Sequence, residues 1–157
     1  MKKIHGTRCF QIALDDAWAA QERPEEGGLT FVNASAGMRL YITGGLINAE
    51  GRDLPTTAVQ MNAHALGSLA KDLERAGGKF QRDAPVISDS SDGFQVEITA
   101  EVTGPPEVQE QMVLVTFLQS WVWALVRLSS KATPRQELLN RWRNLRTDFI
   151  LVEATRK

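Results

Sequence analysis

Cysteine, histidine and tyrosine are scarce in this 157-residue chain, which has one Cys, two His and one Tyr. A single cysteine cannot form an internal disulfide, and Cys9 alternates with core-type residues, so we interpret it as a small buried side chain. Zinc centres need three or four closely spaced Cys, His or carboxylate ligands, and no region of the sequence offers them. The sequence therefore predicts no metal ion and no cofactor.

Long apolar runs and an excess of charge of one sign are absent too. The 18 basic and 19 acidic residues leave a net charge of −1, too weak a field to attract nucleic acid or an anionic membrane. The longest apolar run, residues 121–126, is far below the roughly 20 residues that cross a bilayer. Lys2 and Lys3 are not followed by the apolar stretch of a signal peptide. We expect a cytoplasmic protein with no nucleic-acid partner and no stable membrane insertion.

Catalytic motifs are missing as well. A nucleophile needs a neighbouring base, but His5 lies close to the N-terminus and His64 inside a predicted helix. The sequence has no hydrolase Gly-x-Ser-x-Gly turn and no glycine-rich phosphate loop. Residues 88–93 lack the alternating carboxylates of a calcium loop and are interpreted as a hairpin turn. We predict that the protein is not an enzyme.

Alternating apolar residues predict three strands in the first half of the chain. They are expected from Arg8 to Leu14, from Leu29 to Asn33 and from Met38 to Ile42, the last two as a hairpin. Gly44-Gly45 is predicted to end this part of the sheet.

Helix signals occur twice. Pro55 to Ala76 is predicted as a helix that Gly77 closes, and its predicted buried stripe is Val59, Ala63, Leu66, Leu69, Ala70 and Leu73. Thr133 and Gln136 predict a capping box that opens a second helix, expected to end the domain. Its predicted apolar face is Leu138, Trp142, Leu145 and Phe149. Its arginines are interpreted as a solvated face, with an acidic partner as the alternative: Arg135, Arg141, Arg143 and Arg146.

The second half reads mainly as sheet. A short strand is predicted at Val86-Ile87. It is followed by a strand from Phe94 to Val102, in which the residues expected to face solvent are Gln95, Glu97, Thr99 and Glu101. Two further strands are predicted from Met112 to Leu118 and from Trp121 to Ser129. The whole chain, residues 1–157, is thus predicted as a single α+β domain in the order βββαββββα. Its antiparallel sheet has about six to seven strands and carries two helices.

The last two strands are apolar on both faces. If a hairpin joins them, parity sorts their side chains. One face is aliphatic and is interpreted as core: Val113, Val115, Phe117, Val122, Ala124, Val126 and Leu128. The other mixes aromatic, aliphatic and polar groups, as interfaces do, and its predicted partner-binding residues are Leu114, Thr116, Leu118, Trp121, Trp123, Leu125 and Arg127. The alternative is that a helix covers this second face and buries the strands on both sides.

Several segments resemble the PsbP-like fold, in particular its bacterial DcrB-like branch. They are Phe10 to Trp18, Leu29 to Asn33, Met38 to Thr43, the helix from Pro55 to Ala76, and Val115 to Leu128 before the terminal helix. Within that branch the chain is similar to the Eag-type chaperones of type VI secretion. These small cytoplasmic proteins use a groove on the sheet to shield transmembrane segments of toxic effectors. The resemblance implies that the mixed face serves as such a groove.

We therefore expect a non-enzymatic adaptor or chaperone for a protein client, either an effector or a toxin. A homodimer is a further possibility, because two copies can share one apolar patch. One alternative is a cytoplasmic immunity protein that neutralises a toxin through loops and rim charges. Another is a domain that binds a small ligand in a pocket between sheet and helix.

Overall fold

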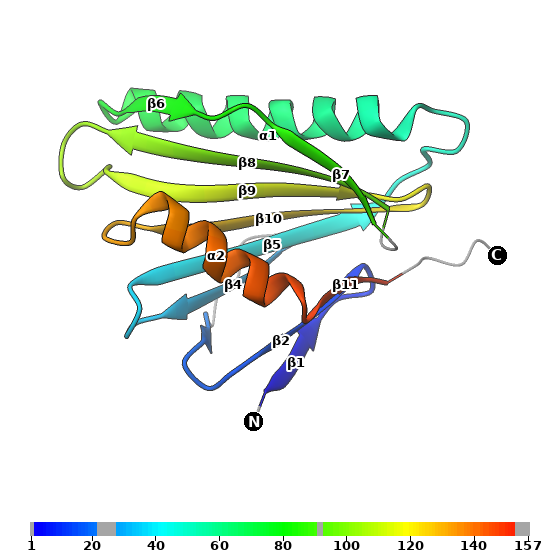
Figure 1. The fold of residues 1–157 in the computed structure, drawn as a ribbon, viewed down its shortest axis with the longest axis horizontal. Coiled ribbons are helices and arrows are strands. Elements are labelled where there is room, and N and C mark those ends of the chain that lie inside the picture. Colours follow the sequence, from blue (N-terminus) through cyan, green and yellow to red (C-terminus); the bar gives the residue numbers. More distant parts are fainter. Residues whose placement is uncertain (1, 22–27, 91–92, 153–157) are drawn as a thin grey trace.

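The computed structural model describes residues 2–21, 28–90 and 93–152 (Figure 1). The strands are β1 (Lys3–Gly6), β2 (Phe10–Leu14), β3 (Ala19–Ala20), β4 (Gly28–Asn33), β5 (Met38–Leu46), β6 (Lys79–Arg82), β7 (Val86–Ser90), β8 (Gly93–Thr103), β9 (Glu110–Leu118), β10 (Val122–Ser130) and β11 (Phe149–Leu151). The helices are α1 (Leu54–Arg75) and α2 (Arg135–Arg146). The predicted α+β class and antiparallel pairing are confirmed.

Two antiparallel sheets form the molecule. The main sheet has the order β3-β4-β5-β10-β9-β8-β6, with β7 also paired to β8, and the smaller sheet has the order β1-β2-β11. In Figure 1, α2 crosses in front of the main sheet and α1 runs along β6 and β8. The small sheet and α2 pack on one face of the main sheet, and α1 packs on the other. We call these the α2 face and the α1 face.

The α2 face carries the larger core. Leu118 pairs with Trp123 across the β9–β10 hairpin, so residues of equal parity share a face, as predicted. All seven aliphatic and aromatic residues assigned to the core are fully buried. An aromatic cluster from β9, α2 and β11 fills the centre, with the Phe117 and Phe149 rings 4.7 Å apart and Trp142 beside both.

On the α1 face, the first helix packs on β8 and β9. Leu66 contacts Ile98 and Leu114, and Val96 belongs to the cluster around Ala58 at the start of the helix. The predicted stripe of α1 needs one correction, because Ala63 is exposed while Ala58 and Asn62 are buried. The buried positions follow the i, i+4 spacing from Ala58. Gly77 adopts φ +90° and ends the helix region as predicted.

Some strands were not predicted. Each of β1, β3, β6 and β11 is short and lies at or beside a sheet edge, where pairing partners rather than periodicity stabilise it.

The second helix differs from its prediction at both ends. It ends at Arg146, and Phe149, which was predicted on its apolar face, belongs to β11 and is buried in the core of the α2 face. Residue Pro134 is the N-cap and no side chain caps the helix, so the predicted capping box does not form.

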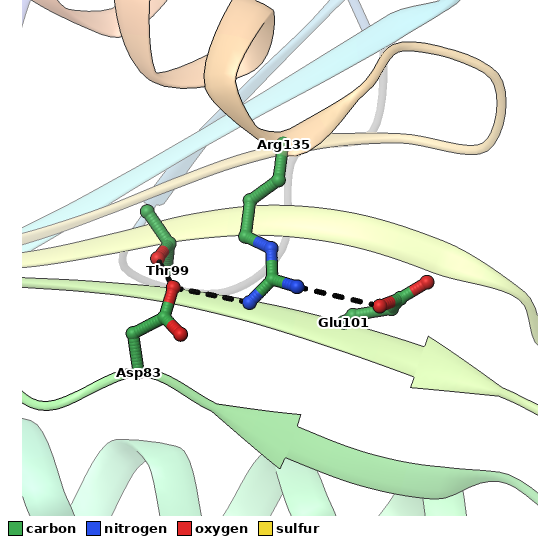
Figure 2. A network of polar contacts seen from close by, with 4 residues as sticks. All are labelled: Asp83, Thr99, Glu101 and Arg135. Atoms are coloured by element: carbon green, nitrogen blue, oxygen red, sulfur yellow. Dashed lines mark hydrogen bonds and ion pairs between the residues drawn. The ribbon is translucent and has the colours of Figure 1, made fainter.

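The outer side chains of β8 meet α2 instead of solvent, which corrects the sequence prediction. Arg135 donates to Asp83 Oδ2 at 3.0 Å and to Glu101 Oε2 at 3.4 Å. The Thr99 hydroxyl donates to the same Asp83 carboxylate (Figure 2). This bond, and after it the charge of Arg135, hold the pKa of Asp83 below its ordinary value of 3.8, against an opposing effect of burial. The network joins the start of α2 to β8 and to the β6–β7 connection.

Further polar contacts continue this network along α2 and form a charged seam between α2 and β8. Arg143 lies 3.5 Å from the carboxylate of Glu97, which is 7% exposed. Arg146 donates to Gln95 at 3.2 Å and to the Phe149 carbonyl at 3.0 Å. The interpretation of the α2 arginines as a solvated face is therefore wrong for Arg135 and Arg146, which are half-buried. It is correct for Arg141 and for Arg143, whose side chain stays 58% exposed beside Glu97. A polar stripe on one element can pack against a polar stripe on another, which single-element periodicity cannot reveal.

Candidate functional site

The α1 face of the main sheet is only partly covered. The helix rests on β8 and β9, where Val96, Ile98 and Leu114 are at most 2% exposed. Strand β10, which pairs with β9, presents Trp123, Leu125 and Arg127 on the same face, and all three are only half-buried. The uncovered part of this sheet face continues from β10 onto β5.

A groove of about 440 Å³ lies between the flank of the N-terminal half of α1 and the uncovered sheet beside it. Its floor is formed by Thr116, Trp123 and Leu125, and the flank of α1 forms one wall. The wall and rim residues are Ile47, Arg52, Thr57, Gln60, Met61, His64 and Ala65. The floor is mainly apolar, and the polar groups lie mostly along the rim, so the groove suits an apolar group flanked by polar ones.

A glycine shapes the floor of the groove. Trp123 pairs with Gly45 of β5, and a Cβ atom on Gly45 would lie 2.8 Å from Trp123 Nε1. Such a contact is too close for any real side chain, so the indole occupies the space that the missing side chain leaves. The prediction that Gly44-Gly45 ends the strand is therefore wrong, because β5 runs through both glycines to Leu46.

A buried amide fixes α1 beside the groove. Asn62 is 1% exposed, and its Nδ2 donates to Thr116 Oγ1 at 3.0 Å and to the Val96 carbonyl at 3.4 Å. Its Oδ1 has no hydrogen-bond partner among the residues that the structure describes. The two donated bonds tie the helix to β8 and β9 and so set how far its flank stands from β10.

Beyond Leu125 the apolar floor ends at a cation. Arg127 is the next residue of β10 on this face, and its guanidinium carbon lies 5.5 Å from the centre of the Tyr41 ring on β5. The distance is typical of a cation–π contact. Within the described ranges, no carboxylate lies close enough to Arg127 to form an ion pair.

The structure divides the seven predicted binding residues into two groups. Leu114, Thr116 and Leu118 are at most 2% exposed beneath α1, so the alternative that a helix covers this face is correct for β9. The others are half-buried: Trp121 before β10, Trp123 and Leu125 in the groove, and Arg127 beyond it. A client that binds the intact fold therefore meets β10 and not most of β9.

The helix side of the groove was not predicted. Met61 and Ala65 lie one turn apart on α1, beside the buried stripe, and Ile47 follows β5. The available signal was the continuation of apolar residues to one side of that stripe, which marks a helix flank that meets something other than water.

Other kinds of site find little support in the described part of the chain. No three His, Cys, Asp or Glu side chains within 2–21, 28–90 and 93–152 gather as a metal site would require. The turn predicted at residues 88–93 includes Ser91 and Asp92, which lie outside the described residues. Neither α1 nor α2 combines the length and apolar character that a bilayer-spanning helix needs.

Comparisons with known proteins identify the fold. Neither a protein-family model nor a curated protein sequence matches this chain. The solution structure of cyanobacterial PsbP (CyanoP) from Synechocystis sp. PCC 6803 is similar, with a TM-score of 0.73 at 9% sequence identity. The match covers 96% of this chain and 91% of that one. The PsbP-like fold is thereby confirmed, and at this identity the likeness concerns the fold alone. The finer resemblance to the DcrB-like branch and to Eag-type chaperones stays a prediction.

Proposed function

We propose that the protein is a non-enzymatic adaptor or chaperone that holds an apolar segment of a protein client in the groove between α1 and β10. The observation that supports this proposal most is the half-covered α1 face. A packed sheet normally hides its apolar side chains, yet here Trp123 and Leu125 stay half-buried beside a groove. Trp, Met and Arg, all present here, are enriched where proteins meet.

The dimensions favour a helix or an extended segment as the client. Trp123, Leu125 and Arg127 stand on one face of β10, and a strand advances about 3.3 Å per residue. The row from Trp123 to Arg127 is therefore about 13 Å long, or roughly two and a half turns of a bound helix. A segment of that length fits beside α1 with its apolar side on the floor and its polar side towards the rim.

The resemblance to Eag-type chaperones suggests which client this is. It would be an effector of type VI secretion whose apolar transmembrane segments are shielded before export. This choice rests on the sequence segments that resemble the family, because the fold alone is compatible with many functions. The same client would also explain why the groove stands open in the chain on its own.

The immunity alternative depends on charged rims and loops rather than on the groove. Arg135 and Arg143 of α2 are already paired with carboxylates of the same chain, so they offer less to a toxin than the sequence suggested. A small ligand would use the same groove, whose volume falls within the usual range of about 300–1,000 Å³ for such sites.

The proposal is tested by comparing the affinity of the wild-type chain and of Trp123→Ala for an apolar peptide. The probe is a neutral Leu/Ala helix of about four turns with glutamine ends, titrated into the full chain by calorimetry. We expect the substitution to weaken binding by about 2 kcal/mol or more, the scale of an interface hot spot. It should cost only about 1–2 kcal/mol of unfolding free energy, because the ring is already half exposed.

Trp121→Ala is the matched control, since Trp121 is also half-buried but does not line the groove. It should leave peptide affinity nearly unchanged. Trp142→Ala, in the α2-face core, should instead lower the unfolding free energy by about 3–5 kcal/mol. No binding of the peptide by the folded wild-type chain, or equal losses for Trp121 and Trp123, would show that the groove is not the binding site.

A further inference from the structure

The arginines on the two faces of the main sheet differ in whether a carboxylate lies beside them. On the α2 face, Arg135 and Arg143 each lie within 3.5 Å of a carboxylate. On the α1 face, Arg127 is half-buried and has no carboxylate within 4.0 Å in the ranges that the structure describes. A guanidinium partly withdrawn from water without a counter-ion is unfavourable, and binding an anion there would relieve it.

Tyr41 prepares this guanidinium for a partner. The cation–π contact, with the guanidinium carbon 5.5 Å from the centre of the Tyr41 ring, holds the group over the ring and limits its rotation. The contact uses the charge of the guanidinium and not its N–H donors, which stay free to bind a carboxylate with two parallel hydrogen bonds. Because the arginine is already positioned, less conformational entropy is lost on binding.

The groove positions the apolar part of the client. Its lining contains no acidic residue that would repel the client's carboxylate. Arg127 follows Leu125 on the same face of β10, about 6.6 Å further along the strand. An apolar segment on Trp123 and Leu125 thus brings a residue at its end to Arg127.

We propose that Arg127, held over the Tyr41 ring, is a carboxylate-binding anchor that selects client segments in which an acidic side chain directly follows the apolar stretch. This inference rests on the proposed function and adds the charge pattern of the client. The occupant is a peptide segment with one apolar face and an Asp or Glu at its end. Complementarity between this end and the unpaired guanidinium sets both which clients bind and the direction in which they lie.

Three synthetic helices test the anchor. They share one neutral apolar stretch and end in paired Glu, paired Gln or paired Lys, and each is titrated into the full chain. We expect the Glu peptide to bind roughly tenfold more tightly than the Gln peptide, the scale of one charge-assisted hydrogen-bonded pair. The Lys peptide should bind most weakly. In Arg127→Gln the Glu and Gln peptides should bind alike, and raising the salt concentration should reduce the wild-type preference.

Two control variants locate the effect. Arg143→Gln removes an arginine from the opposite face and should leave the preference intact, as should Arg52→Gln at the other end of the groove. Loss of the preference in Arg52→Gln but not in Arg127→Gln would overturn the proposal. Arg127→Lys should retain part of the preference, because it keeps the charge but not the paired hydrogen bonds.

The outcomes separate this inference from the proposed function. If the three wild-type affinities are equal, the anchor does not exist while peptide binding stands. If none of the peptides binds the folded chain, the proposed function itself fails. If light scattering shows a dimer that Arg127→Gln dissociates, a second copy occupies this face and the anchor proposal falls. Displacement of the Glu peptide by dodecanoate at equal concentration would likewise assign the site to a fatty acid.

Discussion

The two faces of the main sheet are covered to different extents. The α2 face is packed by a helix and by the β1-β2-β11 sheet, which together enclose its apolar residues. The α1 face has one helix. An α-helix is about 10–12 Å across with its side chains and strands lie about 4.8 Å apart, so a single helix covers about two strands. It covers β8 and β9, and β10 is left beside it, with Trp123 and Leu125 on the floor of an open groove.

The adjacent glycines of β5 show the same contrast within two residues. Gly44 faces the closed side, where a Cβ atom would meet the Trp123 carbonyl oxygen at 2.8 Å and the Cys9 and Phe10 side chains at 3.3 Å. Gly45 faces the groove, where the obstructing atoms belong to the Trp123 ring. One glycine therefore permits close packing of backbone, and the other makes room for the Trp123 ring.

The largest expected effect is the difference in unfolding free energy between two truncations on the α1 face. Ile98→Ala should lower the unfolding free energy by about 2–4 kcal/mol, because Ile98 is 2% exposed beneath α1 and its removal leaves a cavity. Leu125→Ala should cost about 1 kcal/mol, because half-buried Leu125 opens onto the groove. Urea unfolding measures both. Equal losses would mean that the cover of α1 extends over β10.

A smaller effect is expected from the two glycines. Gly44→Ala should destabilise by about 2 kcal/mol, because the added methyl meets backbone and core atoms that cannot retreat. Gly45→Ala should cost about 1 kcal/mol or less, because the Trp123 ring can turn towards the groove. It should nevertheless weaken peptide binding more than Gly44→Ala does. Calorimetry and urea unfolding on both variants decide this, and the reverse order of stabilities would refute the assignment of faces.

The smallest effect concerns the charged seam between α2 and β8. Because the pKa of Asp83 is lowered in the folded state by Thr99 and Arg135, its carboxylate stabilises the fold above the ordinary pKa of 3.8. That contribution is lost as the pH falls through the folded-state pKa. The stability difference between wild type and Asp83→Asn should therefore shrink below this ordinary pKa.

Thr99→Val is the control for that titration, because it removes the hydrogen bond that contributes most to the lowered pKa. It should flatten the pH dependence in the same direction as Asp83→Asn. Parallel pH profiles for wild type and Asp83→Asn, measured by urea unfolding, would show that the carboxylate adds no pH-dependent stability.

Most of the long elements could be predicted from the sequence. The extent of α1, its closure at Gly77 and the strands β8, β9 and β10 follow from local periodicity and turn signals. The short edge strands could not be predicted, since residues such as those of β6 are strands only because β8 offers them a partner. The accessible part of the α1 face was predicted in part: Trp123, Leu125 and Arg127 are half-buried, but Leu114 and Leu118 are fully buried.

What the sequence by itself determined is the sorting of side chains between the two faces. Parity across the β9–β10 hairpin alone places Phe117 on one face and Trp123 on the other. What only the tertiary structure decided is how much of each face is covered. That depends on the width of a helix relative to a sheet and on the Asn62 hydrogen bonds that hold α1 over β8 and β9. These are distances between segments far apart in the chain, which local sequence patterns do not encode.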